Sequence, residues 1–218
     1  MMGWGQEAPE SRLAAMPDPL LLLDYVGVTV FAITGALVAA RKGEDFIAFV
    51  AFAIFTGVGG GTLRDLLMGV PVFWIHSSGY LAVCLAGAGA VWLLGAGLWR
   101  SPALVWLDAV GLSAYAMLGA WKALVIGIPP GVAVVMGTIT ATFGGLLRDL
   151  FSGTPSALLR RELYISAAIA AAASFVALRQ AFTDTLLCGV IAFLVGFTLR
   201  AGAILWHWTL PGFGARRG

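Results

Sequence analysis

Residues 57 to 69 read GVGGGTLRDLLMG: three consecutive glycines and then, after two more residues, an arginine beside an aspartate. Residues 144 to 153, GGLLRDLFSG, repeat the same order of Gly-Gly and Arg-Asp. Glycine inside a helix costs about 1 kcal/mol relative to alanine, so consecutive glycines weaken a helix locally. The two stretches therefore predict two helices that are each broken at a Gly-Gly site.

The composition indicates an integral membrane protein. Hydrophobic residues make up 60% of the chain and charged residues 11%, whereas roughly a quarter of residues are charged in soluble domains. Cys84 and Cys188 lie in apolar runs, and His76 and His207 stand apart from other metal-binding side chains, so we expect neither disulfides nor a metal site. A net charge of +2 without a basic aromatic surface argues against nucleic-acid binding. No nucleophile stands with a base, so we expect no enzyme and no cofactor.

Seven stretches are long and apolar enough to span a bilayer, which takes about 20 residues of helix. They are Leu20–Ala40, Phe46–Met68, Tyr80–Trp99, Leu104–Val125, Gly131–Phe151, Leu163–Leu178 and Leu186–Trp206. We therefore expect an all-α membrane protein. Its parts are a polar tail (1–18), two three-helix units (19–100 and 101–182), a seventh helix (183–210) and a basic tail (211–218). Met16, just before the hydrophobic body, is a second candidate for the start of translation.

The chain contains an internal repeat. The stretch Leu23–Pro71 aligns with Leu107–Pro155 without a gap, and 19 of 49 positions are identical. The identical positions include three charged ones, which chance similarity between apolar helices would not produce. Each unit holds three spans, so the second unit enters the membrane from the opposite side, as in inverted-repeat transport proteins.

Basic residues in the short loops predict the orientation. One side of the membrane collects Arg41, Lys42, Arg100, Arg160, Arg161, Arg216 and Arg217, while the other has Arg12, Lys122 and Arg179. The first side is expected to be cytoplasmic. This places the N-terminus outside and the C-terminus inside.

The glycine-rich stretches predict a cavity within the membrane. The expected breaks lie at Gly59, Gly60, Gly61, Gly144 and Gly145. In lipid, an opened backbone is tolerated only beside protein or water, so matching breaks in inverted repeats indicate a substrate or ion site near the midplane. The alternative is that the glycines only allow close helix packing, because Gly57 and Gly61 also form a small-x-x-x-small face.

The paired charges support a cavity, because an arginine or aspartate in a membrane span costs about 2.5 to 3.5 kcal/mol even on lenient scales. Neighbouring residues on a helix point about 100° apart. We therefore expect pairing across the repeats, Arg64 with Asp149 and Arg148 with Asp65. These four side chains are the main candidates for the pore constriction.

Three threonines are further pore candidates. Thr62 lies three residues before Asp65, which is the spacing of a capping box that would close a new helix start. Thr56 and Thr140 precede the two breaks and either line a pore or donate back to their own helices.

Two acids and a lysine complete the set of polar residues near the spans. Asp24 and Asp108 are either acids at a pore entrance or simple complements of a helix dipole. Lys122, near the end of the fourth span, is expected to extend toward the membrane surface rather than into a pore.

The doubled motif, Gly60-Gly61-Thr62-Leu63-Arg64-Asp65 and Gly144-Gly145-Leu146-Leu147-Arg148-Asp149, resembles the prokaryotic branch of the trimeric intracellular cation (TRIC) channel family. The resemblance covers the chain from Leu20 to about Trp208. It implies a homotrimer in a prokaryotic inner membrane, in contact with membrane lipids. It also implies one hourglass pore per protomer, lined by the second and fifth helices and permeable to potassium and sodium. This chain lacks the Lys-Glu-Val triplet of the animal members, so phosphoinositide binding is not implied.

Residue chemistry alone leaves two other classes open. Broken helices in inverted repeats are as typical of a secondary transporter for a small polar solute, such as a neutral amino acid, as of a channel. Two arginines and two aspartates sum to zero, so they do not select an ion by charge. A scaffold without transport activity would tolerate replacement of Arg64 and Arg148.

Overall fold

The computed structural model describes residue 13 and residues 16–95, 101–153 and 163–209. These ranges hold seven helices: α2 (Asp18–Lys42), α3 (Phe46–Met68), α4 (Gly79–Leu94), α5 (Ser101–Val125), α6 (Pro130–Ser152), α7 (Ile165–Ala181) and α8 (Thr185–Trp206). Each helix lies on one of the seven predicted spans, and the bounds of α3 are those predicted. The all-α membrane fold is confirmed.

The seven helices differ in length. Five of them, α2, α3, α5, α6 and α8, are long and apolar enough to cross a membrane. The third helices of the two units, α4 and α7, have 16 and 17 residues. At about 1.5 Å per residue such helices are roughly 25 Å long, a little less than the hydrocarbon core of a typical bilayer.

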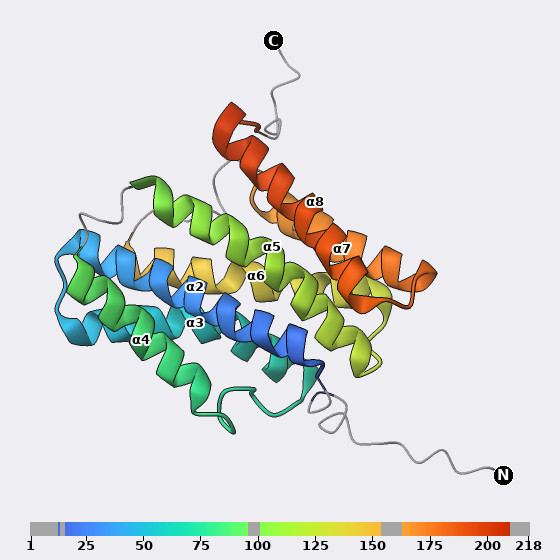
Figure 1. Ribbon diagram of the computed structural model, residues 1–218, viewed down its shortest axis with the longest axis horizontal. Coiled ribbons are helices and arrows are strands. Elements are labelled where there is room, and N and C mark those ends of the chain that lie inside the picture. The colour runs from blue at the N-terminus through green and yellow to red at the C-terminus, as the bar shows by residue number, and fades with distance from the viewer. Residues whose placement is uncertain (1–12, 14–15, 96–100, 154–162, 210–218) are drawn as a thin grey trace.

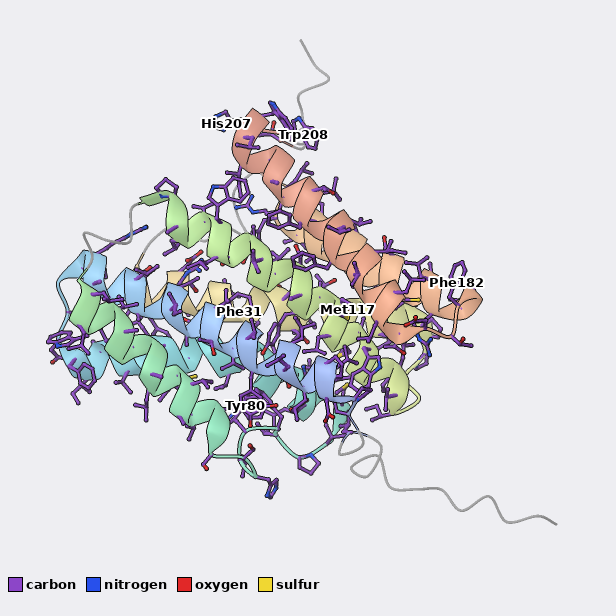
Figure 2. The ribbon with its side chains drawn as sticks, in the orientation of Figure 1. Phe31, Tyr80, Met117, Phe182, His207 and Trp208 are labelled. Carbon is purple, nitrogen blue, oxygen red and sulfur yellow. The ribbon has the colours of Figure 1, made fainter. Side chains whose placement is uncertain are left out.

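Helix α5 lies at the centre of the fold and contacts α2, α6, α7 and α8 (Figure 1). Its middle is enclosed, because Leu112, Tyr115 and Leu118 are each at most 2% exposed. The first unit packs α2 against α3 and α4, the second packs α5 against α6 and α7, and contact between α3 and α6 joins the two units. Figure 2 shows Phe31 inside this core and Phe182 at the periphery, where its side chain is exposed.

Equivalent glycines end the middle helices of the two units. Gly69 follows α3 with a φ of 68°, and its N–H reaches the carbonyls of Asp65 and Leu66. Gly153, which aligns with Gly69 in the repeat, follows α6 with a φ of 64° and makes the equivalent contacts. Glycine adopts this left-handed conformation without the strain of a Cβ, which explains its presence at both positions.

The predicted helix breaks are wrong. Helix α3 runs without interruption through Gly59, Gly60 and Gly61, and α6 runs through Gly144 and Gly145. A broken helix in lipid exposes backbone groups that each cost several kcal/mol, whereas a helical glycine costs only about 1 kcal/mol. The helices therefore stay intact, and the glycines serve close packing.

Candidate functional site

Helices α3 and α6 cross in direct backbone contact at the middle of the fold. A Cβ added at Gly60 would lie 2.2 Å from the carbonyl oxygen of Thr140, and one added at Gly144 would lie 2.4 Å from that of Thr56. The two contacts are exchanged between the repeats, since Gly60 is equivalent to Gly144 and Thr56 to Thr140. Along α3 the contacts run from Thr56 to Gly60, while their partners along α6 run backwards, from Gly144 to Thr140. The two helices therefore cross antiparallel. The packing alternative thus explains these glycines.

The threonine hydroxyls at the crossing behave differently. Thr140 Oγ1 donates to the carbonyl of Met136 over 2.6 Å, which is the back-bonding alternative. Thr56 Oγ1 is buried and has no hydrogen-bond partner among the described residues. A buried hydroxyl without a partner is costly, so Thr56 stays the better pore candidate of the two.

The arginines pair with the aspartates beside them, so the predicted pairing across the repeats is wrong. Arg64 Nε lies 2.8 Å and Nη2 2.7 Å from Asp65 Oδ1. Arg148 Nε and Nη2 both lie 3.0 Å from Asp149 Oδ1. Neighbouring side chains leave a helix about 100° apart. The arginine side chain is nevertheless long enough to bend back to the aspartate that follows it. The antiparallel crossing also sends the two motifs to opposite ends of the fold.

Asp24 is the centre of a buried polar cluster that the sequence analysis did not foresee. Lys122 Nζ lies 2.6 Å from Asp24 Oδ2, and the hydroxyls of Tyr80 and Tyr115 donate to the same carboxylate over 3.0 and 3.1 Å. Asp24 is 1% exposed and Lys122 is 5% exposed. Asp24 lies well inside α2, beyond its first turn, so the helix-dipole alternative is wrong.

The prediction that Lys122 extends to the membrane surface is also wrong. Its ammonium lies 5.1 Å from the centre of the Phe73 ring, so its side chain is directed into the protein. The alignment of the two units already distinguishes this lysine. The position equivalent to Lys122 in the first unit is Val38, so this charge has no counterpart in the other unit.

Asp108 occupies the equivalent place in the second unit but has a different partner. Arg148 Nη1 donates to Asp108 Oδ1 over 2.8 Å, so this one guanidinium bridges Asp108 and Asp149. In the first unit, Asp24 is held by Lys122, and Arg64 reaches only Asp65. Nη1 of Arg64 is buried without a hydrogen-bond partner among the described residues.

Thr62 does not cap a helix, so the predicted capping box is wrong. Its hydroxyl donates to the carbonyl of Val58 over 2.7 Å and accepts from Trp74 Nε1 over 2.9 Å. Asp65 Oδ2 accepts from the backbone N–H of Phe73 over 3.0 Å. Both side chains therefore fasten the loop between α3 and α4 to the end of α3.

The charged clusters line two separate cavities. The first, here called the Arg64 cavity, has a volume of about 560 Å³, and its polar lining residues are Asp24, Arg64, Asp65, His76, Ser77, Tyr80 and Lys122. The second, the Arg148 cavity, has about 200 Å³ and is lined by Arg41, Lys42, Asp108, Arg148, Asp149, Ser152 and Arg200 among others. Arg64 and Arg148 each follow a crossing glycine by four residues along antiparallel helices. The crossing therefore lies between the two cavities.

Arg200 is a functional candidate that the sequence analysis missed. It comes from α8, outside the repeat, is 4% exposed, and lies 5.2 Å from the centre of the Tyr164 ring. A buried arginine in an otherwise apolar span is the signal that identifies it. Arg200 adds a cation from α8 to the lining of the Arg148 cavity, whereas no residue of α8 lines the Arg64 cavity.

An inverted pair of three-helix units, with a polar cavity at each end of their crossing, defines a membrane transport protein of the inverted-repeat class. The chain belongs to the TRIC channel family, which confirms the resemblance of the doubled motif. The family profile that matches is described as "Glycine transporter", and it matches residues 21–96 and 105–180. The two matched ranges begin and end at positions that the alignment of the two units makes equivalent, which confirms the internal repeat.

Several relatives are similar over nearly the whole chain. A crystal structure of the TRIC channel orthologue from Rhodobacter sphaeroides is 45% identical, with a TM-score of 0.85 over 88% of this chain and 100% of that one. A UPF0126 membrane protein of Vibrio cholerae is 35% identical over 94% of this chain and 87% of the relative. The UPF0126 inner membrane protein YadS of Escherichia coli is 34% identical over 88% and 94%.

Proposed function

We propose that each protomer conducts monovalent cations, potassium or sodium, between the Arg64 cavity and the Arg148 cavity. The observation that carries this proposal is the pair of cavities lined by charged residues on opposite sides of the α3–α6 crossing. It is supported by the 45% identity to a TRIC cation channel orthologue. No cofactor and no catalytic residue take part in this function, and the solved neighbour is a channel rather than an enzyme.

The conformation described above is the closed one under this proposal. At the crossing, Gly60 and Gly144 touch the facing backbone so closely that not even a methyl group fits between the helices. The four acids that line the cavities already accept hydrogen bonds from protein donors. Conduction then requires α3 and α6 to separate, with Thr56 and Thr140 forming the narrowest part of the open path.

The protein is proposed to act as a homotrimer in a prokaryotic inner membrane. The Rhodobacter orthologue is described as trimeric, and the Escherichia coli relative is described as an inner membrane protein. The N-terminus is placed outside and the C-terminus in the cytoplasm, on the basis of the loop charges. A C-terminal green fluorescent protein fusion that fluoresces in whole cells supports this orientation, and a dark but membrane-inserted fusion contradicts it.

Single-channel recording of the purified protein in planar bilayers tests the function directly. Unitary current steps that reverse at the potassium equilibrium potential are expected. Saturable counterflow of a solute without current steps would refute the channel. Loss of current on replacing Arg64 or Arg148 separates a pore from a scaffold, because a scaffold does not depend on either side chain.

A carrier for a small neutral amino acid is the second candidate function. The description of the matched family profile as "Glycine transporter" favours it. Counterflow of labelled glycine in proteoliposomes, measured beside the bilayer recordings, separates the two functions. A carrier exchanges glycine at a saturating rate, while a channel passes ions without exchanging glycine.

A further inference from the structure

The two cavities are lined by equivalent positions of the two repeats, but their charges differ. Three charged positions are common to both: Asp24, Arg64 and Asp65 in the Arg64 cavity, and Asp108, Arg148 and Asp149 in the Arg148 cavity. Lys122 is the other charged residue of the Arg64 cavity, so its described lining sums to zero with His76 neutral. The described lining of the Arg148 cavity adds Arg41, Lys42 and Arg200, and therefore carries two net positive charges.

The additional cations occupy places that the repeat does not duplicate. Arg41 and Lys42 lie in the last turn of α2, and the alignment of the two units places Val125 and Ile126 at the equivalent positions. Arg200 comes from α8, which lies outside the repeat. The two units have therefore diverged so that an excess of positive charge lines the cavity at one end of the α3–α6 crossing and not the cavity at the other.

The acids of the neighbouring loop lie outside the Arg148 cavity. Glu44 and Asp45 follow α2, where both are exposed, and neither lines the cavity. Asp45 instead accepts from the N–H of Ala48 at the start of α3. The loops predicted on this side of the membrane also hold more basic than acidic residues. The fixed charge at this entrance is therefore positive.

From this difference we infer that the channel rectifies, so that cations pass more readily from the Arg64 cavity to the Arg148 cavity than in the reverse direction. The inference rests on the proposed channel function. Fixed charge of one sign in a cavity lowers the local concentration of ions of the same sign, and so limits the supply of cations from that side. The charges act through their field, so buried ones such as Arg148 need not touch the ion. In the proposed orientation, cations enter the cell more readily than they leave it.

The size of the effect follows from Coulomb's law and the screening by salt. For a cation about 8 Å from two unit charges in water, with a Debye length of about 10 Å at about 0.1 M salt, the local concentration falls about twofold. At about 1 M salt the Debye length is about 3 Å, and the same charges change the concentration only about 1.1-fold. Rectification should therefore be clear at low salt and nearly absent at high salt.

Single-channel recording of the purified full-length protein, with the same potassium chloride solution on both sides, tests the inference. The conductances at equal and opposite voltages are expected to differ about twofold at about 0.1 M and to be nearly equal at about 1 M. Equal conductances at low salt, or a ratio that does not change with salt, overturn the inference but leave the channel proposal intact. Absence of any current overturns both.

A Lys42→Cys variant tests the direction and the role of charge within a single channel. Lys42 is exposed, whereas the natural cysteines, Cys84 and Cys188, are buried. A charged, membrane-impermeant methanethiosulfonate therefore reacts from the chamber that faces the Arg148 cavity. The thiolate displaces methanesulfinate and forms a mixed disulfide with the charged group. The reaction thus identifies how each channel is inserted.

Two reagents of similar size and opposite charge provide the matched control. A trimethylammonium-ethyl reagent restores the positive charge of Lys42 and should return the ratio to about two, with the larger current for cations that enter from the other chamber. A sulfonatoethyl reagent brings the lining to zero net charge and should make the conductances nearly equal. Equal effects of the two reagents, or a larger current for cations that enter from the Arg148 side, refute the inference.

Discussion

Replacing Gly60 by alanine tests the α3–α6 crossing directly. The new Cβ would lie 2.2 Å from the backbone oxygen of Thr140. Because a normal carbon–oxygen contact is about 3.3 Å, the helices must separate by roughly 1 Å. The obstructing atom belongs to the backbone of an intact helix, so no side-chain rotation relieves the clash.

The expected loss of stability follows from two opposing effects. Overpacking of this kind costs about 1–3 kcal/mol, and alanine recovers about 1 kcal/mol of helix propensity. Because the obstruction is backbone, we expect a net loss of roughly 2 kcal/mol, which is about 4–8 °C in the unfolding temperature of a chain of this length. Gly144→Ala should cost a similar amount. One separation of the helices relieves both clashes, so the double variant should lose less than the sum.

Thermal unfolding of the purified protein in detergent measures these differences. The matched control is Gly89→Ala in α4, where an added Cβ meets nothing within 4 Å. That variant should gain up to about 1 kcal/mol from helix propensity. If Gly60→Ala is as stable as Gly89→Ala, the close crossing is not present in the protein and the reasoning fails.

Two further substitutions test the polar contacts. Asp24→Asn leaves the buried Lys122 without a carboxylate and should lower the free energy of unfolding by about 3–5 kcal/mol. Adding Lys122→Met should restore at least half of that loss. Additive losses in a double-mutant cycle would contradict a direct pair. Thr62→Val removes the acceptor of Trp74 Nε1 and should cost about 1 kcal/mol. Hydrogen exchange should quicken in the loop between α3 and α4 but not in α7, and uniform exchange would contradict the local contact.

The repeat and the spans could be predicted from sequence because both depend on patterns along the chain. Length and hydropathy identified all seven helices, and the charged identities between the two aligned units identified the repeat. The inversion followed from the odd number of spans in each unit. The prediction of helix breaks was wrong because it used only the helix propensity of glycine, about 1 kcal/mol per residue. It left out the packing of each glycine against the other helix. The contact of Gly60 with Thr140 joins residues far apart in the chain, which no local pattern reveals.

The sequence analysis named four charged residues as candidates for a pore constriction, and it predicted their pairing wrongly. Arg64, Asp65, Arg148 and Asp149 do line the two cavities. Their pairing depends on how far an arginine bends back along its own helix, and on which lysine reaches Asp24 from a distant helix. The mismatch of Val38 and Lys122 was visible in the alignment of the repeats, and it marks the place where the two units differ in chemistry.

The inverted repeat also constrains how such a chain can be assembled. Each crossing contact requires one copy of the unit from either side of the membrane, so a chain of a single unit would have to insert in both orientations and pair with itself. Joining the units fixes one orientation for each. A residue such as Lys122 can then exist on one side alone, and the two faces of the membrane can differ in what they admit.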